Sequence, residues 1–169
     1  ILLHPKNTYL YGMRHTSFIP FPKPALWLLV LFIPLCSCKK KISQEEADEK
    51  IIKQYISDKG LNAKATGSGL YYVVDAEGTG VNPNINSTVT VVYRGTLTNG
   101  TEFDKSSSTG ATFLLANVIK GWQEGIPLYK KGGKGKLLIP SALGYGNQAT
   151  GKIPASSVLI FDVELLDVK

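Results

Sequence analysis

The chain has 169 residues, of which 43% are hydrophobic and 19% are charged, a composition typical of one modest globular domain with extensions. This composition excludes a disordered chain and a membrane protein with several spans. The formal net charge is +6, but the first 37 residues contain three basic and no acidic side chains, which leaves 16 basic against 13 acidic groups in the rest. That near balance argues against a nucleic-acid-binding surface.

Histidine and cysteine are confined to the first 38 residues. From residue 39 onward, the chain therefore cannot use Ser/His/Asp or Cys/His catalysis, a zinc ion held by His or Cys, or an internal disulfide. Any chemistry in this part must use shape, aromatic surface, hydroxyls, amides and carboxylates.

The amino-terminal segment has the pattern of a secretory signal peptide. Basic residues precede an apolar run at 25–35, which contains a proline and is too short to span a bilayer. The run ends in Leu35-Cys36-Ser37-Cys38, which resembles a bacterial lipobox. Cleavage before Cys38 would leave this cysteine as the lipid-modified first residue. A plain signal peptide and an amino-terminal anchor helix are the alternatives.

We therefore assign residues 1–37 to a signal peptide and residues 38–66 to a lipid-anchored spacer with a short helix. Residues 1–12 could precede the true start, because Met13 is the only methionine. The lipid would hold the protein at a membrane of the cell envelope, on the periplasmic side or exposed at the surface.

A short helix is predicted to begin after Ser43, because Ser43 and Glu46 have the spacing of a capping box and Gly60 is placed to end the helix. Its apolar residues fall at helical spacing. They are Ala47, Ile51, Ile52, Tyr55 and Ile56. This stripe would dock on the following domain or pair with a second copy of the helix. We favour docking, and the oligomeric state stays open.

After residue 67 the pattern changes to short strands separated by turn residues. Strands are predicted at 70–74, 89–97, 136–139 and 158–166, and one interior helix at 119–129. One short helix among mostly antiparallel strands indicates an α+β domain, in which a curved antiparallel sheet wraps around that helix.

Five motifs in this part resemble the FKBP-type peptidyl-prolyl cis-trans isomerases in their order and spacing. They are Val91–Gly95, Gly100–Ser106, Val118–Gly125, Ile139–Gly146 and Ile153–Leu166. The resemblance covers residues 67–169 and implies an isomerase domain that assists the folding of exported proteins. It implies proline-containing unfolded or partly folded polypeptides as partners, with macrolides as further ligands. The activity that it implies requires no metal or cofactor.

The aromatic residues of these motifs would each be read as core packing if they stood alone. Tyr93 and Phe161, however, occupy strand positions whose faces would point to the helix near Trp122. Tyr145 lies between Gly144 and Gly146, in a loop that would let its ring lean over the same place. A concave apolar pocket with a few polar groups at its rim is the usual form of a ligand site.

The resemblance assigns a role to each residue of such a pocket. Trp122 would be the floor, with walls made by Tyr93, Phe103, Val118, Ile119 and Phe161 and a rim lined by Ile153. The backbone N–H of Ile119 and the hydroxyl of Tyr145 would bind substrate carbonyls, and Asp104 would lie beside the twisting amide. The alternatives are a turn-capping carboxylate for Asp104 and an exposed loop aromatic for Tyr145.

Three residues depart from the family pattern at the rim. Ala111 stands where many members have an aromatic residue, Asn117 where an acid is common, and Lys152 where an apolar residue is usual. These departures predict a wider and more polar rim, which bears on sequence preference, turnover rate and macrolide affinity.

Three other functions remain as alternatives. The same cup could hold proline-containing segments without catalysis, as a chaperone would. The lysine-rich and glycine-rich stretch 130–136 could bind phosphate, but it lacks the spacing and terminal Ser/Thr of a nucleotide loop and fits a solvated hairpin better. A purely structural envelope lipoprotein is the third alternative.

Overall fold

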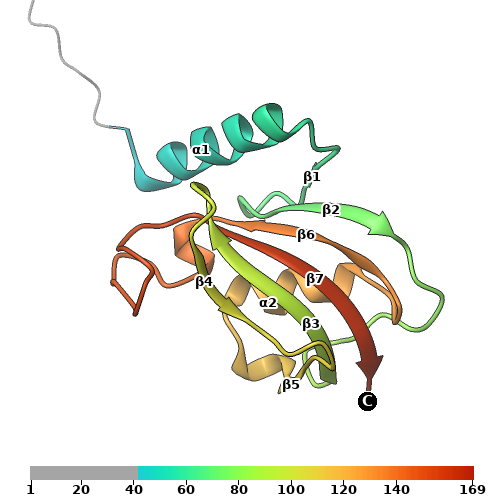
Figure 1. Ribbon diagram of the computed structural model, residues 1–169. Helices are drawn as coiled ribbons and strands as arrows, with labels where there is room; N and C mark the ends of the chain where they lie inside the picture. The colour runs from blue at the N-terminus through green and yellow to red at the C-terminus, as the bar shows by residue number, and fades with distance from the viewer. Residues whose placement is uncertain (1–41) are drawn as a thin grey trace, which may run out of the picture. The chain divides into compact units, whose positions relative to one another are not determined.

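Seven strands form one antiparallel sheet in the computed structural model, which describes residues 42–169 (Figure 1). The strands are β1 (Lys64–Ala65), β2 (Tyr71–Ala76), β3 (Thr88–Leu97), β4 (Glu102–Lys105), β5 (Ala111–Leu114), β6 (Lys134–Ile139) and β7 (Leu159–Val168). Their order is β1-β2-β6-β7-β3-β4, and β5 also pairs with β3. The predicted signal peptide and the predicted lipid site at Cys38 lie outside the described residues.

The interior helix α2 (Lys120–Gly125) lies against one face of the sheet, which curves around it (Figure 1). This confirms the predicted α+β architecture. The helix is shorter than predicted, because residues Ile126–Leu128 form a 3-10 turn instead of a further α-helical turn. Pro127 has no N–H to donate within a continuing helix and its ring would crowd the preceding turn.

The central strands present different residues to the two faces of the sheet, as alternation requires. Leu137 pairs with Phe161 and Leu138 pairs with Ile160 across β6 and β7. Leu137 and Phe161 belong to the core around α2, whereas Leu138 and Ile160 belong to a second cluster beneath the amino-terminal helix. Both faces of these two strands are therefore covered by a helix.

The amino-terminal helix α1 (Gln44–Lys59) begins and ends where the sequence predicts. Ser43 and Glu46 form the complete capping box, and Gly60 closes the helix in the left-handed region at φ 60°. Ile52 is fully buried in the second cluster. The helix therefore docks on the sheet, which is the arrangement we favour from the sequence. No helix within residues 42–169 has the length and apolar character needed to cross a membrane.

Three strands, β1, β4 and β5, were not predicted. They have two, four and four residues, and their side chains are exposed or only partly buried. Alternation cannot be recognised over so few residues, and these strands exist because β2 and β3 offer them hydrogen-bonding partners.

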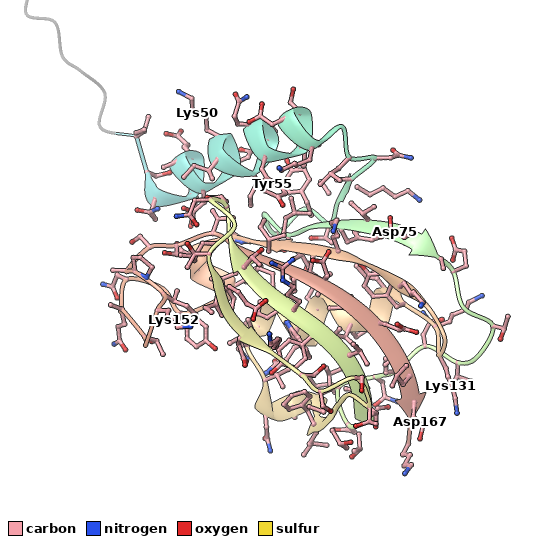
Figure 2. The ribbon with its side chains drawn as sticks, viewed as in Figure 1. Lys50, Tyr55, Asp75, Lys131, Lys152 and Asp167 are labelled. Carbon is pink, nitrogen blue, oxygen red and sulfur yellow. The ribbon has the colours of Figure 1, made fainter. Side chains whose placement is uncertain are left out.

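The lysines at 130–136 lie around the turn into β6, and three of the four form ion pairs with β7. Lys131 bonds Asp167 at 2.6 Å, and the two lie together at the end of β7 (Figure 2). Lys134 and Lys136 pair with Glu164 and Asp162. Three of these lysines are thus matched by carboxylates, which agrees with a solvated hairpin and not with a phosphate site.

Candidate functional site

Four aromatic rings surround or adjoin the indole of Trp122 on α2. The ring centroids of Tyr93, Phe161 and Phe113 lie 5.1, 5.4 and 5.6 Å from that of Trp122, with interplanar angles of 89°, 80° and 84°. Phe103 packs on Phe161 at 5.4 Å and 83°. These edge-to-face arrangements are the favourable geometry for aromatic pairs. Four of the five rings singled out from the sequence therefore converge, from three strands and one helix: Tyr93, Phe103, Phe161 and Trp122.

The cluster combines buried rings with partly exposed ones. Trp122 and Phe161 are each only 4% exposed. Tyr93, Phe103, Val118 and Ile119 are partly exposed and pack against the buried rings. A buried aromatic floor with partly exposed walls is the form expected of an apolar binding site.

Gly95 allows two of these rings to approach each other. It pairs with Phe161 across β3 and β7, and a Cβ atom there would lie 2.5 Å from Cε2 of Phe103 and 2.9 Å from Cε1 of Phe161. Both distances are well inside van der Waals contact. The absence of a side chain at Gly95 therefore leaves room for the Phe103 wall.

Asp104 lies on β4 and is held next to the rings by two donors. The Tyr93 hydroxyl donates to its Oδ2 at 2.8 Å, and the Lys105 backbone N–H donates to its Oδ1 at 2.8 Å. Burial, and then the hydrogen bond and negative charge of Asp104, raise the pKa of Tyr93 to about 12. The Tyr93 phenol thus remains a neutral donor that orients the carboxylate at neutral pH.

The amino end of α2 presents an unused donor beside the rings. Ile119 is the N-cap residue, and its carbonyl accepts the N–H groups of Trp122 at 2.9 Å and Gln123 at 3.1 Å. Within residues 42–169, the N–H of Ile119 itself makes no hydrogen bond. A helix start leaves such groups free for a ligand. This donor is where the resemblance implies that a substrate carbonyl binds.

Gln123 fixes the segment that carries this donor. Its side-chain amide donates to the carbonyls of Ala116 at 3.0 Å and Val118 at 2.8 Å. The sequence reasoning missed this residue, although a glutamine in the first turn of a helix can bond the preceding backbone.

Tyr145 and Ile153 come from the segment between β6 and β7. Tyr145 follows the 3-10 helix Ser141–Leu143, is 39% exposed, and lies close enough to Tyr93 to contribute to the raised pKa of that phenol. Ile153 is 6% exposed and packs in the same buried cluster as Trp122. Its role at the rim stays a prediction.

Phe113 on β5 is the aromatic member that the sequence reasoning did not include. Its ring lies 6.0 Å from Tyr93 in addition to its contact with Trp122. Pairing of β5 with β3 places Phe113 opposite Val89 and Ala111 opposite Val91. Because β5 is not recognisable as a strand from sequence, its inward face could not be identified.

The residues that depart from the family pattern are at or near the surface. Asn117 and Lys152 are exposed, whereas Ala111 is partly buried on β5. Lys152 lies in the long loop between β6 and β7 (Figure 2).

Comparisons with known proteins support the same domain. Residues 80–166 match the family model for FKBP-type peptidyl-prolyl cis-trans isomerases. The isomerase FkpA of Escherichia coli (strain K12) is 44% identical over 140 residues, which are 79% of this chain and 51% of that protein. FkpA of Buchnera aphidicola subsp. Schizaphis graminum is 50% identical over 121 residues, 70% of this chain and 47% of that protein. The chain thus spans about half the length of the curated relatives it matches.

Solved structures agree with this chain in fold. The crystal structure of FkpA from Escherichia coli has a TM-score of 0.67 and 44% identity, covering 75% of this chain and 59% of that chain. A peptidyl-prolyl cis-trans isomerase from Pseudomonas syringae pv. tomato has a TM-score of 0.64 and 30% identity, covering 76% of this chain and 98% of that chain. On the sequence match, the fold and the ring cluster together, the chain belongs to the family of FKBP-type peptidyl-prolyl cis-trans isomerases.

Proposed function

We propose that this protein catalyses cis-trans isomerisation of X–Pro bonds in polypeptide clients at the ring cluster around Trp122. The observation that carries the proposal is the convergence of five aromatic rings beside an unused backbone N–H at the start of α2. A pyrrolidine ring is compact and apolar, and a buried indole with edge-on neighbours offers it a matching floor.

The reaction needs rotation about one bond and no bond cleavage. Amide resonance opposes that rotation with a barrier of about 18 to 20 kcal/mol, so free X–Pro bonds exchange over tens to hundreds of seconds. The twisted amide has less charge separation than the planar amide and therefore needs water less. An apolar pocket consequently disfavours the planar state more than the twisted one, which is differential binding of the transition state.

The polar groups at the pocket would orient the chain around the rotating bond. The Ile119 N–H and the Tyr145 hydroxyl would hold neighbouring carbonyls, so that the twist is confined to one linkage. The carboxylate of Asp104, held by the Tyr93 hydroxyl at 2.8 Å, would favour the altered dipole of the twisted amide. A thousandfold acceleration requires only about 4 kcal/mol from all these effects together.

The test is a refolding assay in which proline isomerisation limits the slow phase of a client protein. The wild-type chain should accelerate that phase, and Asp104→Asn should reduce kcat/KM by about tenfold because it removes the charge but keeps the size. Asp75→Asn is the matched control, because Asp75 is an exposed aspartate on β2 (Figure 2). In the sheet, β6, β7 and β3 lie between β2 and β4. Delayed aggregation without acceleration would instead identify a non-catalytic chaperone and contradict the proposal.

The same pocket is proposed to bind macrolides. The exposed polar side chains Asn117 and Lys152 would replace apolar or acidic contacts at its edge. A macrolide that fills the pocket should compete with a proline peptide, and Trp122→Leu should weaken its binding. An unchanged macrolide affinity in Trp122→Leu would place the macrolide elsewhere.

Export and lipid anchoring are proposed from the sequence pattern at 25–38 alone. Cys38 would carry the lipid and Cys36 would be removed with the leader. Metabolic labelling with a fatty-acid analogue tests this in the full chain. The label should disappear in Cys38→Ser and persist in Cys36→Ser, and labelling that survives Cys38→Ser would contradict the assignment.

A further inference from the structure

Helix α1 buries one carboxylate that has no part in the proposed reaction. Asp48 is 1% exposed, although most residues around it on α1 are exposed. Its oxygens accept the Gln44 side-chain amide at 2.7 Å and both donors of Ser141, the backbone N–H at 2.8 Å and the hydroxyl at 2.6 Å. Within residues 42–169, no basic side chain pairs with it.

Burying a carboxylate without a basic partner costs desolvation free energy. A buried charge loses its hydration, and three neutral donors compensate this loss only when their geometry is held fixed. The fixed partner is Ser141, which is 93 residues away in sequence and donates two of the three bonds. Asp48 therefore clamps one particular residue of the domain.

Ser141 lies at the start of the segment that carries Tyr145. Its carbonyl accepts the N–H of Gly144 at 3.0 Å and the N–H of Gly146 at 2.8 Å, the two residues that flank Tyr145. The carbonyl of Gly146 in turn accepts the N–H of Ser156 at 2.8 Å. A continuous chain of hydrogen bonds thus runs from α1 through Ser141 to both sides of Tyr145.

We propose that Asp48 is a positioning residue, which holds Ser141 and thereby fixes the Tyr145 hydroxyl at the rim of the proline pocket. This inference rests on the proposed function, because it assigns Tyr145 a role in binding substrate. Helix α1 is then a working part of the catalytic domain and not only a spacer. Its contribution is geometric, since Asp48 bonds Ser141 and not the rings of the pocket.

The first readout is loop order, which does not depend on activity. Amide hydrogen exchange of Gly144 and Gly146 is measured by NMR in the full chain and in Asp48→Asn and Asp48→Ala. Exchange should accelerate by about tenfold or more in Asp48→Ala, and less in Asp48→Asn, which retains one acceptor oxygen. Unchanged exchange in folded Asp48→Ala would overturn the inference.

Ile52→Ala is the matched control on the same helix. Ile52 is fully buried in the cluster that contains Leu138 and Ile160. Its aliphatic side chain has no atom that could accept a hydrogen bond from Ser141. The variant should loosen α1 while leaving Gly144 and Gly146 protected relative to the stability of the whole protein. Equal acceleration in Ile52→Ala would show that docking of the helix in general, and not Asp48, orders the loop, and would contradict the inference.

The second readout is a double-mutant cycle on kcat/KM. Asp48→Ala should lower kcat/KM by about five- to tenfold in the wild-type background and by less than about twofold when Tyr145→Phe is already present. Effects that multiply would mean that Asp48 does not act through Tyr145. If wild type lacks isomerase activity but exchange responds as expected, the proposed function fails while the clamp on the loop stands.

Discussion

A methyl group at Gly95 is expected to displace one wall of the pocket. The added Cβ would lie 2.5 Å from Cε2 of Phe103 and 2.9 Å from Cε1 of Phe161. Carbon atoms in contact lie at about 3.5 Å or more, so a ring must move by about an ångström. Phe161 is 4% exposed and packed on Trp122, whereas Phe103 is only partly buried. Phe103 is therefore the ring that moves.

The loss in activity follows from the contact that Phe103 would make with a bound proline. Full burial of a phenylalanine side chain is worth about 1.5 to 3 kcal/mol, and a wall residue presents only one side to the ligand. Misplacing it should cost about 1.4 kcal/mol of transition-state binding, which is about tenfold in kcat/KM. The same overlap should lower the free energy of unfolding by about 1 to 3 kcal/mol.

The assay measures kcat/KM on a proline-containing peptide for Gly95→Ala, well below its melting temperature. Gly80→Ala is the control, because its Cβ would lie 2.6 Å from Cβ of Lys131, a similar overlap made with a surface residue outside the ring cluster. Gly80→Ala should keep wild-type kcat/KM. If Gly95→Ala folds and its kcat/KM stays within about twofold of wild type, the Phe103 wall does not form the site and the reasoning is refuted.

Further outcomes are expected at three other positions. A proline peptide should change the fluorescence of Trp122 in a saturable way that Trp122→Phe abolishes, and a signal that survives this substitution would place binding elsewhere. Because the folded pKa of Tyr93 is about 12 and the unfolded pKa is about 10, its contribution to stability is present below pH 10 and is lost as pH rises through 12. Urea unfolding from pH 9 to 12 should show a loss of about 1 kcal/mol or less that Tyr93→Phe lacks, and identical pH curves would contradict this cause. In Gly135→Ala the new Cβ would collide with the backbone carbonyl of Val73, so the free energy of unfolding should fall by about 3 kcal/mol or more, and near-normal urea stability would show that the strands can separate there.

The parts of the fold that could be predicted are those encoded locally. Helix α1 carries its capping box and its terminal glycine within its own sequence. The long strands β3 and β7 were found because ten residues suffice to show strand character. The short strands β4 and β5 depend on pairing with β3, so their existence is a tertiary property that no local pattern records.

The candidate site shows the same division. Trp122, Tyr93 and Phe161 lie on recognisable elements, and their convergence followed from the predicted faces of those elements. Phe113 was missed because its strand was missed, and the packing of Phe113 on Trp122 at 5.6 Å is visible only in three dimensions. The bond between the Tyr93 hydroxyl and Asp104 likewise depends on the pairing of β3 with β4.

A domain boundary taken from the sequence resemblance separates helix α1 from residues that it contacts in the fold. The resemblance begins near residue 67 and therefore leaves α1 in a spacer. Yet Ile52 covers Leu138 and Ile160 on the outer face of the sheet, and Asp48 supplies the acceptor for both donors of Ser141. A domain cut at residue 67 would expose that apolar face and leave the two donors of Ser141 without their carboxylate. Both changes would lower the free energy of unfolding. Neither the apolar pattern of α1 nor the family motifs reveal these contacts. These two contacts join α1 to the sheet and to Ser141, so the compact structural unit includes the helix as well as residues 67–169.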